Sequence, residues 1–380
     1  MIKIKLPYLI TVTAAILLIF IGRTIAVDDM LSFQNVPHEI VKAKVQRIVD
    51  LAEPAHSTDG FDDVPPMTSN KKILFEAQVT NGTRKGEIIT AEQSFSPRLT
   101  GKSKEVRKGD NVLLINNYIG WYFNGYVRTN KLLGLGILFV LCILVFGGKK
   151  GFNTILSLAL TCTAIFAVFI PSILSGKNIY IMSILVCVYT MATTPLVVMG
   201  YNKKSLAAIA GCTGGVMIAG LIAIIMDRLL YLTGIVDEHS RYLVNLPGDI
   251  QLNLNAVIFA GIIIGAMGAV MDVAISIASS LWEIKEKTVL IKFKELFRSG
   301  LTIGRDIMGT MADTLILAYI GSSLSVVLIL SVFSGSLLGL FNSEMIAVEI
   351  LQAMAGSFGI LFAMPLTAFF CSIIYLRDSK

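Results

Sequence analysis

The chain has 380 residues, of which 54% are hydrophobic and 15% charged, with a formal net charge of +6 and a mean hydropathy of +0.74. These values exclude an ordinary soluble enzyme and indicate a polytopic membrane protein with one soluble insert. The cysteines lie in apolar runs, where they pack as small apolar side chains, and the histidines lie outside these runs without metal-ligand spacing. The sequence therefore predicts no cofactor and no disulfide framework, and it leaves metal binding open.

The N-terminal segment, residues 1–26, joins Lys3 and Lys5 to an apolar run from Pro7 to Gly22. This pattern is typical of an uncleaved transmembrane anchor or of a signal peptide. In either case, the segment directs the export of the polar region that begins at Val27.

Residues 27–130 are polar, and short alternating runs within them predict five strands. These runs are Val41 to Val49, Ile73 to Thr80, Glu87 to Ser94, Asn111 to Asn116 and Trp121 to Arg128. This number of strands favours a small β-rich, OB-like barrel or sandwich in an extracytoplasmic domain. Acidic and basic residues balance in this part, so no nucleic-acid partner is expected.

Residues 131–380 are predicted to form a seven-helix membrane domain, because apolar runs long enough to span a bilayer recur throughout. The runs are Leu132 to Phe146, Phe152 to Leu174, Ile179 to Met199, Leu206 to Ile225, Val257 to Ile277, Ile307 to Phe333 and Met345 to Tyr375. With the N-terminal segment they make about eight transmembrane helices in an α-helical polytopic protein. Lysine and arginine gather in alternate short loops, which predicts that both termini are cytoplasmic and that residues 27–130 are extracytoplasmic.

Three of these regions carry further detail. Leu206 to Ile225 holds Gly211, Gly214, Gly215 and other small residues, which predict close helix packing. Glu283 to Arg298 mixes lysines with apolar residues and predicts an amphipathic helix on the cytoplasmic leaflet. Ile307 to Phe333 is longer than one perpendicular crossing needs, and Gly321-Ser322-Ser323 interrupts it. The interruption predicts a tilted, kinked or broken helix.

Two apolar segments each contain an aspartate where a membrane helix normally has none. They read GIIIGAMGAVMDVAISIASS, with Asp272, and GRDIMGTMADTLILAYIGSS, with Asp313. An intramembrane carboxylate costs about 2.5–3.5 kcal/mol, so each is expected to be paired, protonated or in contact with water. Helical spacing puts small and polar residues on one face around each aspartate. The topology places the two aspartates on antiparallel helices at similar depth.

The candidate site residues for transport or ion binding are Asp272, Asp313, Ser276, Thr310, Asp306 and Ser279. Their oxygen atoms suit a cation or a carried proton. A water-activating pair for intramembrane hydrolysis is the second chemical interpretation. However, Met311-Ala312-Asp313 lacks the Gly-x-Gly-Asp motif of known intramembrane aspartyl proteases. In the third interpretation, the aspartates only fix helix packing through hydrogen bonds.

The segments GAVMDVAISIASS, SGLTIGRDIMGTMADTLILAYIGSSL and EILQAMAGSFGILFAMPLTA resemble those of the YibE/F family of bacterial multi-pass membrane proteins. The resemblance implies a bacterial plasma-membrane location and a second YibE/F-like subunit, or a homo-oligomer, as partner. It implies no established activity.

Two non-enzymatic functions therefore lead. The first is a permease or channel subunit for a small solute or ion of unknown identity, and the second is a scaffold or sensor with an extracytoplasmic binding domain. The lipid bilayer is the expected surroundings in both cases.

Overall fold

The structure is a computed structural model that describes residues 6–27, 39–52, 72–95, 104–117, 119–244, 251–288, 291–333 and 336–377. The chain folds as two compact units. A helical unit comprises residues 1–31 and 143–380, and a β unit comprises residues 32–142.

The β unit contains a mixed five-stranded sheet. Its strands are β1 (Ile40–Ala52), β2 (Lys72–Val79), β3 (Ile88–Ser94), β4 (Asn111–Asn117) and β5 (Gly120–Tyr126). All five predicted strands are confirmed. β1 pairs antiparallel with both β2 and β4, β2 with β3, and β4 with β5, while β3 and β5 are parallel. The strand order β1-β2-β3-β5-β4 thus returns to its first strand.

Buried and more exposed side chains alternate along β2, so one face of the sheet lies toward an apolar core. Ile73, Phe75, Ala77 and Val79 are buried, whereas the residues between them are more exposed, because successive side chains of a strand point to opposite faces. On the outer face the guanidinium of Arg47 pairs with Glu76 at 2.7 Å. The β unit therefore has an apolar interior of its own and a charged outer face.

The outer carboxylate Glu92 gives the β unit a predicted acid sensitivity. The Lys72 ammonium, 2.9 Å away, and the Ser94 hydroxyl hold the pKa of Glu92 below its ordinary value of 4.5. A lowered folded-state pKa contributes stability above the unfolded pKa, and this stability is lost as the pH falls through the folded pKa. The protection of the β2 and β3 amides against hydrogen exchange, relative to the intrinsic exchange rate at each pH, is thus expected to fall between pH 7 and about pH 3.5 more in wild type than in Glu92→Gln.

The control for this prediction is Glu87→Gln, whose carboxylate lies 3.6 Å from Arg84 in an exposed pair. It should behave like wild type because exposed ion pairs contribute little. An identical pH response in the wild type and in Glu92→Gln would refute the assignment.

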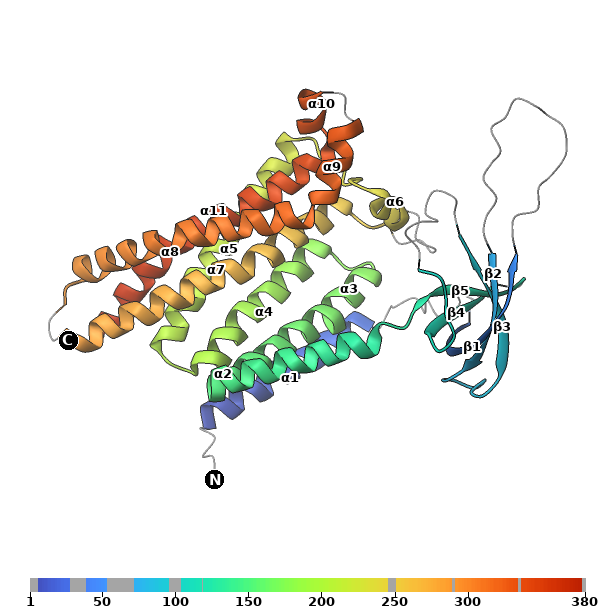
Figure 1. The fold of residues 1–380 in the computed structure, drawn as a ribbon. Helices are drawn as coiled ribbons and strands as arrows, with labels where there is room; N and C mark the ends of the chain where they lie inside the picture. The colour runs from blue at the N-terminus through green and yellow to red at the C-terminus, as the bar shows by residue number, and fades with distance from the viewer. Residues whose placement is uncertain are drawn as a thin grey trace. The chain divides into compact units, whose positions relative to one another are not determined.

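The helical elements follow one another along the chain as Figure 1 shows. They are α1 (Leu6–Val27), α2 (Thr129–Ala164), the π-helical turn η1 (Ile165–Phe169), α3 (Ile170–Leu174), α4 (Ile179–Met199), α5 (Lys203–Leu229), α6 (Glu238–Val244), α7 (Leu254–Lys287), α8 (Phe293–Ser322), α9 (Leu324–Phe333), α10 (Leu337–Phe341) and α11 (Glu344–Leu376).

Among the described residues, six helices are long and apolar enough to cross a membrane, or seven if α8 and α9 form one bent span. The predicted count of eight is not confirmed, because the 46-residue stretch Thr129–Leu174 counts once among these six. Within this stretch, however, two helices meet at a kink, and they correspond to the predicted segments Leu132 to Phe146 and Phe152 to Leu174. Gly148, with φ 51° and ψ −127°, interrupts helical geometry between the two segments. Only glycine adopts such a conformation readily, which explains why the break falls there.

The links of the helical unit fall at two opposite ends. At one end lie the break in α2, the α4–α5 link and the α7–α8 link, together with the start of α1 and the end of α11 (Figure 1). The α3–α4 link and α10 lie at the other end. The basic links that predicted the orientation therefore share one end of this unit. The assignment of that end to the cytoplasm stays a prediction.

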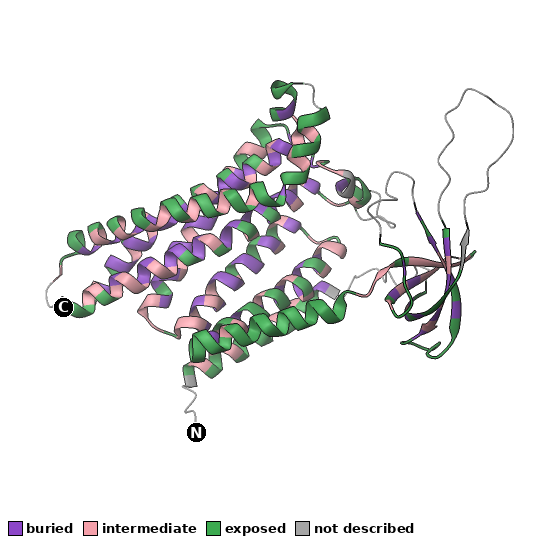
Figure 2. Cartoon of the chain, viewed as in Figure 1, coloured by how far each residue is buried: buried purple, intermediate pink, exposed green. Residues whose placement is uncertain are grey.

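Glycines allow α5, α7 and α11 to approach closely in the buried centre of the helical unit (Figure 2). A Cβ atom on Gly215 of α5 would lie 2.7 Å from both the carbonyl oxygen of Gly359 and the Cβ of Ala363 in α11. A Cβ on Gly211 would lie 2.7 Å from the Cα of Thr367. The close packing predicted for this segment is thus confirmed.

The amphipathic surface helix predicted for Glu283 to Arg298 is wrong. Residues 283–287 continue α7, and residues 293–298 begin α8. Leu296 is fully buried, and Phe293, although 41% exposed, contacts Phe369 of α11. Lys285 of this segment and Lys204 of α5 lie over Trp282, with their Nζ atoms 5.6 and 5.5 Å from the ring centre.

Candidate functional site

Helix α7 exposes the face that contains Asp272. Gly261, Gly265, Gly268 and Asp272 are exposed, whereas Ser276 and Ser279 are half-buried. The opposite face packs against α5 and α11 and carries the large buried side chains Ile262, Ile263, Met267, Val270 and Met271. The predicted face of small and polar residues is thus largely exposed between Gly261 and Asp272, although the Tyr319 hydroxyl lies against it at Gly265.

Helix α8 exposes a second polar face, formed by Thr302, Arg305, Asp306, Gly309, Thr310, Asp313 and Thr314. Its packed face contains the fully buried Leu296 and the glycines Gly300 and Gly304, which lie against α7 and α11. The hydroxyl of Thr310 donates to the carbonyl of Ile307 at 2.9 Å, so it is already satisfied within its own helix. Asp306, Asp313 and Arg305 are the charged groups of this face, and within the described residues none of them makes a hydrogen bond or an ion pair.

The packing of α7 on α8 sets the relative depth of the aspartates. A Cβ on Gly300 would lie 2.9 Å from Leu281, one on Gly304 would lie 3.3 Å from Ile277, and one on Gly265 would meet the Tyr319 hydroxyl. In this antiparallel register Asp272 lies near the level of residue 310. Asp272 and Asp313 thus differ in depth by about one helical turn, roughly 5 Å.

The structure does not join the aspartates into a bonded pair. Within the described residues, Asp272, Asp306 and Asp313 make no hydrogen bond and no ion pair. The same part of the chain contains no group of three or more histidine, cysteine or acidic residues that could hold a metal ion. The acids are consequently separate and accessible at the side of the helical unit.

Two other acids of this protein, Asp227 and Glu344, connect separate segments through hydrogen bonds. Asp227 accepts a hydrogen bond from the Asn255 amide at 2.9 Å, which ties α5 to α7. Glu344 accepts bonds from the backbone amides of Thr233 and Gly234, at 2.6 and 2.8 Å, and from the Thr233 hydroxyl at 2.8 Å. The lack of such partners at Asp272 and Asp313 argues against the interpretation in which they only fix helix packing.

Sequence reasoning missed one further acid in a predicted span. Glu349 lies in the second turn of α11 and is half-buried. It lines a cavity with Tyr319 and Ser323 from the α8–α9 region. The signal available in the sequence was a glutamate near the start of the apolar run Met345 to Tyr375.

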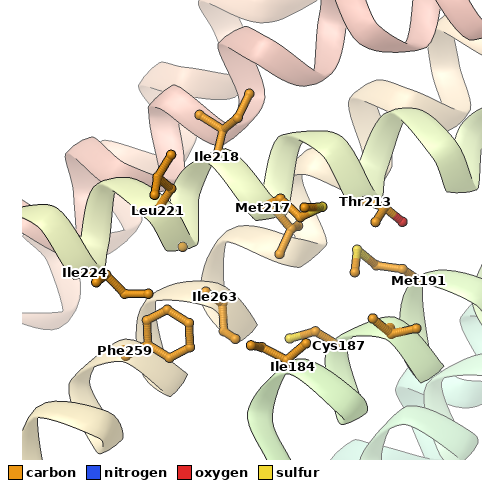
Figure 3. A pocket seen from close by; sticks show the side chains of 13 residues that line it. Ile184, Cys187, Met191, Thr213, Met217, Ile218, Leu221, Ile224, Phe259 and Ile263 are labelled. Carbon is orange, nitrogen blue, oxygen red and sulfur yellow. The ribbon is translucent and has the colours of Figure 1, made fainter. Parts of the chain in front are cut away.

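A larger cavity, of about 520 Å³, lies between α4, α5 and α7 (Figure 3). Carbon and sulfur atoms line nearly all of it, and the Thr213 hydroxyl in its wall donates to the carbonyl of Ile209 at 2.8 Å. None of the six predicted site residues lines this cavity. It suits an apolar occupant such as a lipid chain, and its lining residues include no carboxylate, amine or imidazole.

Comparison with known proteins gives one match. Residues 135–377 match a family model described as YibE/F-like protein. No curated protein and no solved structure matches the chain. The family match covers the region in which the sequence resembles this family, and it confirms that resemblance.

Proposed function

The chain belongs to the YibE/F-like protein family, and we propose that it is a permease or channel subunit for a small ion or solute. The supporting observation is that Asp272, Asp306 and Asp313 are exposed and, within the described residues, make no hydrogen bond or ion pair. Asp272 lies on α7, a candidate membrane span, and the other two lie on α8, which qualifies as a span only together with α9. Facing lipid, each ionised carboxylate would cost about 2.5–3.5 kcal/mol. Their faces therefore require water or another protein, which is the environment of a permeation path.

The position of these faces supports a role for a second subunit. They lie on the surface of the single chain, so a path along them needs another wall. The proposed partner is a second copy or another YibE/F-like protein, and the proposed location is a bacterial plasma membrane with both termini in the cytoplasm. The strand order of the β unit further supports an OB-like barrel on the extracytoplasmic side.

The test is ion uptake into proteoliposomes that contain the purified full chain. With radioactive sodium, radioactive rubidium and a proton-sensitive dye as probes, wild type is expected to exceed protein-free liposomes. Asp272→Asn and Asp313→Asn are expected to lower uptake by about ten-fold or more, because the amide keeps the shape but removes the charge.

The matched control is Thr314→Val, next to Asp313, since its hydroxyl only donates to the carbonyl of Met311 at 2.9 Å. Uptake by this variant should equal that of the wild type. Equal uptake by the wild type and both aspartate variants would contradict the use of these acids. If wild type shows no uptake of any probe, ion permeation fails and the scaffold function gains support.

A further inference from the structure

Two lysines from different helices meet at the ring of Trp282. Lys204 lies in the first turn of α5, and Lys285 lies in the last turn of α7. Their Nζ atoms are 5.5 and 5.6 Å from the same ring centre, and all three side chains are half-buried. Within the described residues, neither lysine makes an ion pair. Two like charges are thus held around one indole ring.

Other contacts hold this ring in place. The Nε1 of Trp282 donates to Glu286 Oε1 at 2.5 Å, and the ring stands edge-on to the fully buried Tyr375 of α11. Because cations favour the face of an indole, the fixed ring gives both ammonium groups a preferred position. Glu286 supplies one negative charge against the two positive ones, and the amino end of α5 adds positive partial charge. The cluster therefore has a net positive charge.

The spacing of charges along α5 and α7 places this cluster at the edge of the hydrocarbon layer. α5 has no charged residue between Lys204 and Asp227, a stretch of about 33 Å, which is close to the hydrocarbon thickness of about 30 Å. α7 carries only Asp272 before Trp282, whereas charges are frequent after it. Tryptophan is also enriched at the level of the lipid headgroups. The two lysines are thus at the depth where phospholipid phosphates lie.

We propose that Lys204, Lys285 and Trp282 bind the headgroup of an anionic phospholipid. Its phosphate supplies the negative charge that the cluster lacks, whereas the choline of a zwitterionic lipid adds a cation that the lysines repel. Because acyl chains already hold the headgroup at this depth, it loses less freedom on binding than a free anion does. Residues 283–298 hold five basic and three acidic residues, so the surrounding field is positive as well. The proposal does not depend on the role of the aspartates in transport.

The test uses Trp282 as the reporter, in a full chain that carries Trp121→Phe and therefore has no other tryptophan. This reporter chain is placed in phosphatidylcholine bilayers that contain a brominated fraction of either phosphatidylglycerol or phosphatidylcholine. Bromine on the acyl chains quenches the fluorescence of a tryptophan that the lipid contacts. Brominated phosphatidylglycerol is expected to bind at Trp282 at least about five-fold more tightly than brominated phosphatidylcholine. Lys204→Gln combined with Lys285→Gln is expected to remove this preference.

The matched control is Lys287→Gln combined with Lys294→Gln, which removes the same charge from exposed positions nearby. Each variant is compared with itself in unbrominated bilayers, because loss of a lysine beside the ring also changes the fluorescence. The control should keep the preference for phosphatidylglycerol, as should Lys204→Arg combined with Lys285→Arg, which retains both charges. Absence of any preference in the reporter chain, or equal losses in the two glutamine double variants, would overturn the proposed site. Displacement of phosphatidylglycerol by excess inorganic phosphate would show a site for free anions and contradict the assignment to a lipid.

Discussion

Replacing Gly215 by alanine is expected to destabilise the helical unit by about 1–3 kcal/mol, because the added methyl group has no room. Its carbon would lie 2.7 Å from the Gly359 carbonyl oxygen and 2.9 Å from Cγ1 of Val270, so α5, α7 and α11 must move apart. A backbone oxygen cannot swing aside as a flexible side chain can. Unfolding in a titration with sodium dodecyl sulfate, followed by tryptophan fluorescence, measures the effect.

The control for this prediction is Gly268→Ala on α7, where nothing lies within 4 Å of the added carbon. In an open helical position, alanine is favoured over glycine by about 0.5–1 kcal/mol, so this variant should be unchanged or slightly more stable. If the two variants were equally stable, the close approach of α5 and α11 would be refuted. A loss of stability in Gly268→Ala alone would show that another subunit covers this face.

Replacing Tyr375 by alanine is expected to cost about 3–5 kcal/mol, the largest effect of any single substitution considered. Tyr375 is fully buried near the end of α11 and is the largest such side chain among the described residues. Its ring stands edge-on to Trp282 of α7, with 5.0 Å between ring centres, and its hydroxyl donates to the Ala278 carbonyl at 2.8 Å. Truncation would therefore leave a cavity where these two helices meet.

Tyr375→Phe separates the two contributions of this side chain. It keeps the ring and loses only the hydrogen bond, so a cost of about 1 kcal/mol is expected. The fluorescence of Trp282 should change in Tyr375→Ala and stay near that of the wild type in Tyr375→Phe. A cost for Tyr375→Phe as large as that for Tyr375→Ala would show that the hydrogen bond, and not packing of the ring, holds these helix ends together.

One sequence-based expectation failed for an identifiable physical reason. The segment from Glu283 to Arg298 has the composition of a surface helix, but composition does not reveal that α7 ends at Lys287, that Leu296 is fully buried or that Phe293 contacts Phe369 of α11. The two segments predicted within residues 132–174 are separate helices that meet at the non-helical backbone of Gly148. The failed expectation depended on long-range contacts, whereas the break at Gly148 is local.

For the candidate site, too, some properties could be predicted from the sequence and others depend on tertiary packing. Helical spacing placed Asp272 and Asp313 on polar faces because that relation is local to each helix. Their missing partners, and the exposure of both faces, depend on which sides of α7 and α8 the other helices cover. Glu349 and Ser323 lie 26 residues apart in the sequence and share a cavity only because the α8–α9 bend packs against α11.

Composition and local periodicity, which depend on residues close together in the chain, are enough to predict the membrane class, the five strands, the location of the apolar segments and the interruption near Ser323. The family follows from the resemblance of three segments, which the family match bears out. Only the folded chain shows which faces of the helices are covered and which acids are bonded. Such relations arise from packing between distant segments, so no local pattern contains them.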